Sequence, residues 1–316
     1  MTADANARSW PQLSATSLWP TMETLQLWVQ IVGKVRLSQT PWLNHGWHVT
    51  LRVSARGLET GLIPHGGVGF DMEFDFIAGE LVVRASDGGE RRIALRSGAV
   101  ADFYAEVMAA LAALGVACRI DLTPDEMAEA TPFPLDGRHR VYDAEVARDY
   151  WCALMQVDRV LNCFRTRFLG KCSPVHLFWG AFDLAVTRFS GRRAPLHPGG
   201  APNLPDAVTR EAYSHEVSSA GFWPGDPGRG PCFYAYAYPA PPGFDAAAVQ
   251  PAAARWDAGL GEFLLPYEAV RTAADPDAML SAFLETTYEA AANLGGWDRA
   301  ALECEEGRPR HPRWVG

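Results

Sequence analysis

The residues of this chain best suited to chemistry are polar side chains set among aromatic ones in its second half. The first group lies in the run from Ser173 to Asp183, where His176 and Asp183 stand among phenylalanine and tryptophan. Burying an unpaired polar group costs about 2–7 kcal/mol, so each of these residues needs a partner or a function. We expect His176 to act as a general base or metal ligand and Asp183 as a second acid–base or orienting group.

A second polar group follows at His215 and Glu216, which a regular strand would place on opposite faces. His176 could meet His215 across a sheet to hold a metal, or meet Glu216 to form an oriented acid–base pair. Arg188 lies five positions beyond Asp183 and so faces the other side of a regular strand; we expect it to clamp an anion. The competing interpretation of the whole set is a polar network inside the core.

Aromatic side chains near these groups could form the walls of a ligand site. Tyr234 and Tyr236 share one face of a strictly alternating strand, and Trp179 and Trp223 flank the polar groups in sequence. The tyrosines can equally form one half-buried face of a sheet, which is the commoner role of such a pattern. We therefore treat all four as candidate ligand-binding residues.

The two lysines and one pair of histidines are further candidates. Lys34 and Lys171 are the only lysines among 28 basic residues, and each follows a glycine at a predicted helix end. A cation there ordinarily complements the helix dipole, whereas a functional lysine would have a lowered pKa or bind a ligand. His45 and His48 lie three apart in a turn and could hold zinc or iron, although one capping a strand and one facing water is the simpler interpretation.

Composition excludes several classes of protein. The chain has 316 residues, of which 48% are hydrophobic and 21% charged, as in globular proteins. A net charge of −9 disfavours nucleic acid and anionic membranes as partners. The six cysteines form no C-x-x-C pair, the first residues lack a signal-peptide core, and no apolar run approaches the roughly 20 residues of a membrane span. We expect a cytoplasmic protein that binds neither nucleic acid nor membrane.

The common catalytic and nucleotide-binding motifs are missing from the sequence. It contains no P-loop, no G-x-G-x-x-G, no G-x-S-x-G and no H-E-x-x-H. The sequence therefore leaves the cofactor unknown, and no motif specifies a metal or an oligomeric state.

Hydrophobic periodicity predicts the elements that position these residues. In the first half we expect a helix from Met22, capped by Thr21, a second helix over 99–114 and strands between them over 48–55, 70–76, 80–84 and 91–95. In the second half we expect helices over 143–168 and 278–294 and strands over 174–188, 214–222, 233–238 and 262–266.

The predicted architecture is α+β, with two similar halves, each helix–antiparallel sheet–helix, around a central cleft where a small ligand would bind. Gly33-Lys34 and Pro41 can be set against Gly170-Lys171 and Pro174, which suggests an internal duplication. We place an N-terminal arm at 1–20, the first half at 21–120, a linker at 121–142, the second half at 143–304 and a C-terminal tail at 305–316.

Four runs of the chain resemble a bacterial family of unknown function that is numbered 5996. They are TLQLWVQIVGKVRLSQTPWLNHGWHVTL, GKCSPVHLFWGAFDLAVTRFSGRRAP, EAYSHEVSSAGFWPG and FYAYAYP. The resemblance extends from about Trp10 to Glu303 and implies one evolutionary unit. It implies no activity, cofactor or catalytic residue.

The residues together favour a small-molecule enzyme with hydrolytic or other acid–base chemistry, metal-assisted or not, at a His/Asp/Glu site in an aromatic cleft. A non-catalytic protein that binds a small ligand is the first alternative. A structural or partner-binding subunit is the second, and in it the same polar residues would be buried partners of one another.

Overall fold

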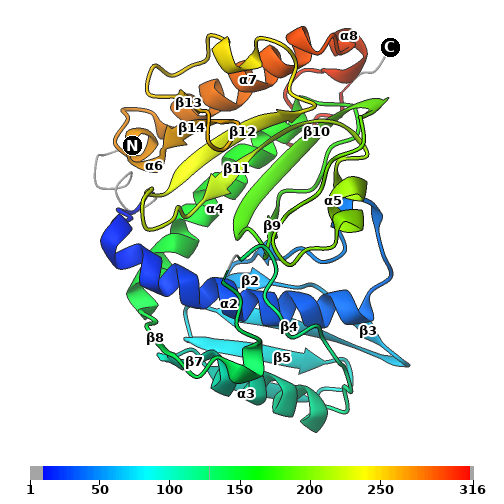
Figure 1. Cartoon of the computed structure of the whole chain (residues 1–316), viewed down its shortest axis with the longest axis vertical. Coiled ribbons are helices and arrows are strands. Elements are labelled where there is room, and N and C mark those ends of the chain that lie inside the picture. Colours follow the sequence, from blue (N-terminus) through cyan, green and yellow to red (C-terminus); the bar gives the residue numbers. More distant parts are fainter. Residues whose placement is uncertain (1–9, 128, 314–316) are drawn as a thin grey trace.

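The structure, a computed structural model, describes residues 10–127 and 129–313. Within these ranges the fold is α+β, as the sequence predicts, and every strand pairing is antiparallel. Figure 1 shows one sheet above helix α2 (Ala15–Gln39) and the other below it, so that this apolar helix runs between them.

The other helices are α3 (Val100–Ala113), α4 (Ala144–Thr166), α5 (Asp206–Ala212), α6 (Tyr267–Arg271), α7 (Pro276–Leu294) and α8 (Arg299–Leu302). Short 3-10 turns are η1 (Asn44–Gly46), η2 (Phe133–Leu135) and η3 (Phe244–Ala246). Asp143 caps α4 and Asp275 caps α7, each through its side chain. Within the described ranges, none of the helices combines the length and apolarity that crossing a bilayer requires.

The first sheet, in the described part of the chain, has the order β1-β2-β4-β5-β6, with β3 added beside β4. Its strands are β1 (Arg52–Val53), β2 (Gly57–Glu59), β3 (Ile63–His65), β4 (Val68–Asp75), β5 (Glu80–Ala85) and β6 (Glu90–Ala94). The strands predicted over 70–76 and 80–84 are confirmed and form a hairpin around Ala78-Gly79, because Asp75 and Glu80 close the β4–β5 pairing. Phe74 stacks with Phe103 of α3, which in turn stacks with Trp28 of α2, so one core joins this sheet to both helices.

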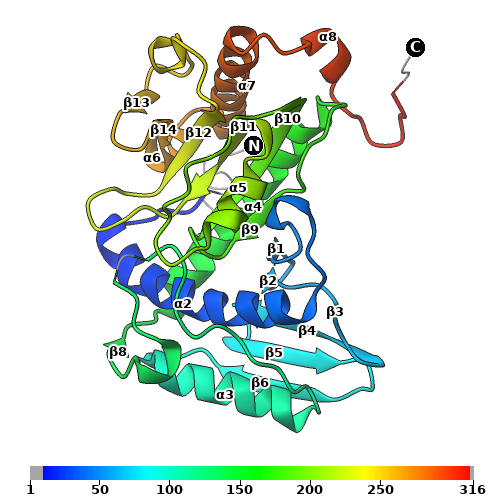
Figure 2. The same cartoon turned by 45° about the vertical axis from the view of Figure 1, so that its right-hand side comes forward.

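The second sheet, again among described residues, has the order β13-β14-β12-β11-β10-β9. Its strands are β9 (His176–Phe178), β10 (Asp183–Arg193), β11 (His215–Trp223), β12 (Cys232–Tyr238), β13 (Arg255–Asp257) and β14 (Glu262–Pro266). A two-stranded ribbon, β7 (Gly98–Ala99) with β8 (His139–Arg140), lies apart from both sheets. Figures 1 and 2 show α4 and α7 on the same face of the second sheet, and Tyr150 of α4 packs against Phe222 there.

Helix α2 begins seven residues earlier than Met22, so the predicted start at Thr21 is wrong and the predicted arm is shorter. Pro20 lies inside the helix, where it removes one backbone donor, yet its carbonyl accepts a hydrogen bond from the Thr24 hydroxyl. The added turns bury Leu18, which is 1% exposed. Burial of this apolar face outweighs the local preference against proline.

The segment 174–188, predicted as one strand, forms two antiparallel strands joined by a tight turn. Phe182 donates its backbone N–H to the Phe178 carbonyl at 2.8 Å and has a φ of 60°. A phenylalanine in this left-handed region is strained by about 1–2 kcal/mol, and its burial against Tyr150 holds it there. The turn reverses the chain at Gly180, so His176 and Asp183 lie on different strands.

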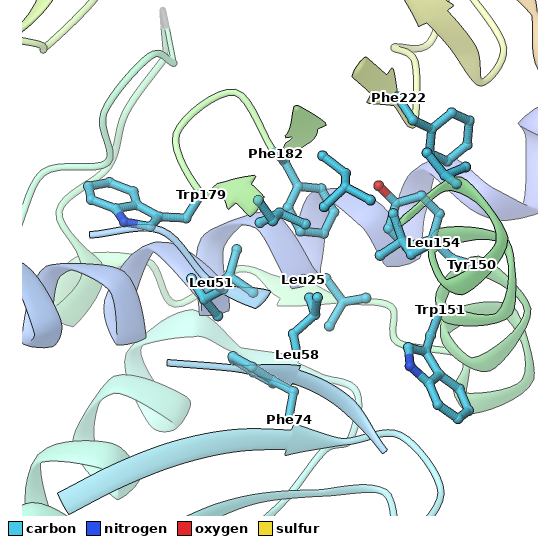
Figure 3. Close-up of a cluster of buried hydrophobic side chains, with 14 of the residues drawn as sticks. Leu25, Leu51, Leu58, Phe74, Tyr150, Trp151, Leu154, Trp179, Phe182 and Phe222 are labelled. Carbon is cyan, nitrogen blue, oxygen red and sulfur yellow. The ribbon is translucent and has the colours of Figure 1, made fainter. Parts of the chain in front are cut away.

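The two sheets are joined by backbone bonds and by one indole. Leu51 and Leu177 exchange both of their backbone hydrogen bonds, at 3.0 and 2.8 Å. Trp179 lies against Gly33 of α2 and donates from Nε1 to the Val49 carbonyl at 2.9 Å. Figure 3 shows the buried cluster around this junction, with Leu58 and Phe74 on the side of the first sheet and Phe182 and Phe222 on the side of the second.

We expect Gly33→Ala to destabilise the protein, although alanine inside a helix ordinarily stabilises by about 1 kcal/mol relative to glycine. A Cβ at Gly33 would lie 2.3 Å from the Trp179 ring, so the buried indole would have to move away from Val49. Such overpacking costs about 1–3 kcal/mol. The measurement is the free energy of unfolding in urea.

Gly67→Ala is the matched control, because a Cβ there meets no atom within 4 Å. We expect its unfolding free energy to stay close to that of the unchanged protein. Equal stability of the two variants would contradict a close contact between the indole and α2.

Candidate functional site

One face of the second sheet is the floor of a pocket of about 1260 Å³. Side chains alternate between the two faces of a strand, and every second residue of four neighbouring strands points to this pocket. The floor residues are Asp183, Ala185, Thr187 and Phe189 of β10, Val217, Ser219 and Trp223 of β11, Tyr234 and Tyr236 of β12, and Glu262 and Leu264 of β14. The intervening residues face α4 and α7 instead.

The walls of the pocket come from segments that are distant in sequence. They include α2 from Trp19 to Leu37, the stretch 42–49, the stretch 121–129, the turn between β9 and β10, and the stretch 197–213 with α5. The predicted linker at 121–142 therefore lines the pocket, both with acidic side chains and with Arg138 and Arg140. A large pocket with a floor of strands and polar groups on its walls is the usual form of a small-molecule site.

Three polar residues of α2, spaced by four, hold two of these walls in place. Gln26 donates to the Gly180 carbonyl at 2.6 Å. Gln30 both donates to the Asp125 carbonyl at 3.0 Å and accepts from its backbone N–H at 2.7 Å. Lys34 lies 2.7 Å from the Asp125 carboxylate. We call Gln26, Gln30 and Lys34 the polar stripe of α2.

Lys34 has a structural role, because it holds the wall of the pocket through ion pairs. Its side chain is 2% exposed, and it pairs with Asp125 at 2.7 Å and Asp121 at 3.5 Å, below the ring of Trp179 at 5.7 Å. Burial raises the pKa of Asp125, and the lysine opposes that rise. Lys34 lines the pocket as predicted, but its charge is neutralised within the wall.

The polar stripe of α2 holds Asp125 in place, and the next residue in the chain, Glu126, lines the pocket. The Glu126 backbone has a φ of 59° and donates to the Pro202 carbonyl at 2.7 Å, which fixes the loop between two segments. Its carboxylate lies over Gly180, where a Cβ would be 2.1 Å from Oε1. Gly180 is therefore required at this position so that the Glu126 carboxylate can approach the turn before Asp183.

Three carboxyl groups, Glu126, Asp183 and Glu262, form what we call the acidic trio. Glu126 keeps part of its surface exposed to solvent, and desolvation by the protein atoms around its carboxyl raises its pKa to about 7, with Asp183 and Asp125 adding to the rise. Burial likewise raises the pKa of Asp183 to about 6 and that of Glu262 to about 7, the latter with help from Asp183. Within residues 10–127 and 129–313, no lysine or arginine pairs with any of the three.

Asp183 is oriented by a tyrosine from two strands away. The Tyr234 hydroxyl donates to the Asp183 carboxylate and partly opposes the rise in its pKa. Tyr234 crosses β11 at Gly221, where a Cβ would lie 2.5 Å from the phenol oxygen. Burial and the neighbouring Asp183 raise the pKa of Tyr234, so its phenol remains a hydrogen-bond donor. Beside it, Tyr236 shares a 2.8 Å hydrogen bond with the Tyr213 hydroxyl.

The predicted site residues divide into two sets. Seven line the pocket, namely Lys34, His45, Trp179, Asp183, Trp223, Tyr234 and Tyr236. The pocket lining does not include His48, Lys171, His176, Arg188, His215 or Glu216. The structure thus separates the predicted catalytic set, of which only Asp183 faces the pocket.

His176 is buried at the junction of the two sheets. Its Nδ1 lies 3.2 Å from the Thr50 hydroxyl, its Nε2 has no hydrogen-bond partner among the described residues, and its ring packs edge-on against Trp47. Burial, with smaller effects from three arginines, lowers the pKa of His176 to about 3. The ring therefore remains neutral, and it hydrogen bonds to neither His215 nor Glu216.

Arg188 lies on the opposite face of β10 from Asp183, as its spacing predicts, and is only 1% exposed. Its guanidinium packs 3.4 Å from the Phe164 ring centroid and 4.3 Å from that of Tyr288, and donates to the Phe164 carbonyl. Glu285 lies 3.8 Å away. Arg188 therefore does not lie where the predicted anion clamp would need it. Its guanidinium instead stabilises the core between the sheet and α7.

His215 and Glu216 begin β11 near the surface and have separate partners. His215 Nδ1 lies 3.1 Å from the Ser214 hydroxyl, and Glu216 pairs with Arg192 at 2.7 Å. In the part of the chain that the structure describes, no three histidine, cysteine or acidic side chains lie close enough to hold one metal ion, and this includes the acidic trio. His176 and His215 have separate hydrogen-bond partners, as do His45 and His48, and the metal pairings stay predictions.

His45 and His48 point to different partners although they share a turn. The ring of His45 lies between the Ala212 carbonyl, 3.0 Å from Nδ1, and Lys171, 2.5 Å from Nε2. His48 Nδ1 accepts from the Leu43 backbone N–H at 3.2 Å. Burial lowers the pKa of both histidines. Lys171, the second predicted ligand-binding lysine, thus contacts a residue of the pocket wall.

The sequence reasoning missed Glu126 and Glu262, two of the three acidic residues that matter most. A signal existed for Glu262, because it shares strand parity with Leu264 and lies in a strand predicted correctly. Glu126 had no such signal, since it stands in a Pro- and Asp-rich loop. Its position depends on Gln30 and Lys34, which are almost 100 residues away in sequence.

Comparison with known proteins gives one match. A family model described as Family of unknown function (DUF5996) matches residues 10–304. No curated protein and no solved structure matches the chain. The matched range includes all residues that line the pocket.

The acidic trio predicts a particular dependence of stability on pH. A carboxyl whose folded pKa is raised from 3.8 to about 6, as for Asp183, contributes stability that is fully present below pH 4 and lost as the pH rises through 6. Asp183→Asn removes this loss, which is on the order of 2–3 kcal/mol for a shift of this size. We therefore expect the variant to be more stable at pH 8 and less dependent on pH between 5 and 8.

Urea unfolding at pH 5 and pH 8 measures this difference. Glu129→Gln is the matched control, because Glu129 lines the same pocket outside the trio. The control should keep the wild-type dependence on pH. An unchanged dependence in Asp183→Asn would mean that this carboxyl remains ionised and hydrated.

Proposed function

The chain belongs to the family of unknown function DUF5996, and we propose that it is a small-molecule enzyme whose acid–base chemistry takes place in the pocket. The observation that carries this proposal is the acidic trio, with pKa values of about 6 to 7 at the floor and wall of one pocket. Carboxyl groups in this range can both donate and accept a proton near neutral pH. Such groups are enriched at catalytic sites.

Each member of the trio has a distinct role in this proposal. Glu126 and Glu262 approach from the wall and the floor, and both have a pKa of about 7, so one can donate a proton while the other accepts one. Asp183 is electrostatically coupled to both residues, because its charge raises the pKa of Glu126 and that of Glu262. The Tyr234 phenol fixes the orientation of Asp183.

The walls indicate the kind of substrate. Trp179 and Trp223, with Tyr234 and Tyr236, offer aromatic faces beside the trio, and these suit a planar or ring-shaped molecule. The unpaired carboxyls disfavour an anion beside them, and the two arginines of the lining, Arg138 and Arg140, are both paired with Asp136. We propose a neutral or cationic substrate and a hydrolytic or other proton-transfer reaction, which needs no cofactor.

We further propose that the pocket is a cleft between two duplicated halves, in a protein of the bacterial cytoplasm. In support of duplication, Lys34 of one half lies over Trp179 of the other at 5.7 Å, and Lys171 lies over Trp47 at 5.4 Å. In support of a reducing compartment, the six cysteines are free in the described structure.

A second candidate is a non-catalytic protein that binds an organic cation. One observation favours it: among the described residues, five tryptophans line the pocket beside the trio, and indole faces attract cations. They are Trp19, Trp42, Trp47, Trp179 and Trp223. Binding would lower the pKa values of the carboxyls and release protons.

The acid–base proposal predicts that Glu126→Gln and Glu262→Gln each lower turnover by 10²-fold or more, because a positioned proton donor or acceptor contributes about 10²–10⁴-fold. The measurement is hydrolysis of a panel of neutral and cationic nitrophenyl esters and glycosides. For any compound that is turned over, we expect a narrow bell-shaped pH profile with its maximum near pH 7, set by the pKa values of about 7 of Glu126 and Glu262.

Glu129→Gln again serves as the control and should retain full turnover. The melting temperatures of all three variants show whether a loss arises from unfolding. Full turnover in Glu126→Gln would contradict the assigned role. Thermal stabilisation by organic cations with no product, on the other hand, would favour the binding protein.

A further inference from the structure

We propose that Lys171 is a nucleophilic amine that forms a Schiff base with an aldehyde or ketone at the rim of the pocket. The geometry points to this through a chain of hydrogen bonds between three groups: the Lys171 ammonium, the His45 ring and the Ala212 carbonyl. A nucleophile within hydrogen-bond reach of a base, with a third group orienting the base, is the general arrangement of nucleophilic catalysis.

The tautomer of His45 follows from its partners. The Ala212 carbonyl, 3.0 Å from Nδ1, can only accept a hydrogen bond, so Nδ1 carries the proton. Nε2 is then an unprotonated acceptor that faces Lys171 Nζ at 2.5 Å. Lysine must therefore donate, and the imidazole is placed to take a proton from the ammonium.

The backbone of His45 is held in an unusual conformation for this contact. Its φ is 60°, in the left-handed region, and Glu211 accepts its backbone N–H at 3.1 Å. The ring packs against Phe189 at 4.6 Å. Strain of this kind persists only where the surroundings enforce it and is common at functional sites.

Lys171 lies among aromatic rings and has no ion-pair partner. Its Nζ lies 5.0 Å from the Phe189 ring and 5.4 Å from the Trp47 ring, whose faces attract an ammonium. No carboxylate pairs with it in residues 10–127 and 129–313, so the imidazole of His45 is the group placed to take its proton. The ionisable groups that face the Lys171–His45 pair are Glu211 and His215, whose ring is 6.1 Å from that of His45. Partial burial lowers the pKa of Lys171, and Glu211 opposes this effect.

Lys171 stands beside the pocket, although it is not part of the pocket lining. It is exposed, and the three residues around its ammonium, His45, Trp47 and Phe189, all line the pocket. Phe189 lies six residues beyond Asp183 on β10, about 20 Å along a strand. The amine therefore forms a second centre, and it does not depend on the acid–base role proposed for the trio.

The step balances as follows. His45 Nε2 takes one proton from the Lys171 ammonium, and the freed lone pair attacks the carbonyl carbon of the substrate. A C–N bond forms while the C=O π pair moves to oxygen, and one proton passes from the new N⁺H₂ group to that oxygen, which gives a neutral carbinolamine whose nitrogen has regained its lone pair. His45 then returns a proton to the hydroxyl, which leaves as water, and the nitrogen lone pair forms the protonated imine.

The sharpest test uses the fact that Lys34 and Lys171 are the only two lysines of the chain. The full-length protein is incubated at pH 7 with glycolaldehyde and cyanoborohydride, and the reduced adduct is located by peptide mass spectrometry. Nα-acetyllysine amide in the same tube is the reference amine. We expect Lys171 to be labelled at least tenfold faster than the reference and Lys34, bound to Asp125, to remain unlabelled.

His45→Gln tests the role of the imidazole. We expect labelling of Lys171 to fall tenfold or more in this variant while labelling of the α-amine is unchanged. If His45→Gln lowers the melting temperature, the pH profile of the unchanged protein decides instead: half-maximal labelling of Lys171 should occur at least one pH unit below that of the reference.

Labelling of Lys171 at the rate of the reference amine, with the same pH profile, would overturn the proposal and leave an ordinary surface lysine. Labelling that is fast but insensitive to His45→Gln in a folded variant would overturn the role of His45 as its base. The readout requires no turnover, so a failure of the acid–base function proposed for the trio would leave it unaffected.

Discussion

The buried ion pair between Lys34 and Asp125 is the interaction on which the pocket depends. It fixes a loop of the chain to the middle of α2, in a site where the lysine side chain is 2% exposed. Removing either partner would leave a buried charge without a counterion, which typically costs 3–5 kcal/mol. The pair also neutralises Asp125, so the carboxyl of this wall that is coupled to Asp183 is the adjacent Glu126.

Three glycines also shape the site, because three of its side chains occupy space that a Cβ at those positions would fill. Trp179 lies on Gly33, Glu126 on Gly180 and the Tyr234 phenol on Gly221. Each contact brings a functional group of one segment against the backbone of another. The acidic trio is thus assembled from a loop and two strands that local sequence does not connect, and close backbone approach replaces direct linkage.

Periodicity predicted most elements of the fold, and its failures have physical causes. The helix over 143–168 and the hairpin around Gly79 combine strong patterns with a capping aspartate and a turn glycine, and both are confirmed. The turn at 179–182 was missed because a buried aromatic run continues through it, with Phe182 at a positive φ that its residue type disfavours. The prediction that Arg188 and Asp183 face opposite sides concerned residues within one strand and was correct.

The candidate site was harder to predict than the fold, because a strand pattern gives the face of a residue and not its partner. His176 and Asp183 are both buried polar groups in one aromatic run, yet His176 lies at the junction of the two sheets and Asp183 lines the pocket. The two lysines make the same point. Both follow glycine and both lie over a tryptophan, but Lys34 meets a carboxylate and Lys171 meets an imidazole. A carboxylate neutralises an ammonium and holds its proton, whereas a neutral imidazole can accept that proton; the partner, contributed by a distant segment, decides which lysine is structural and which is available for chemistry.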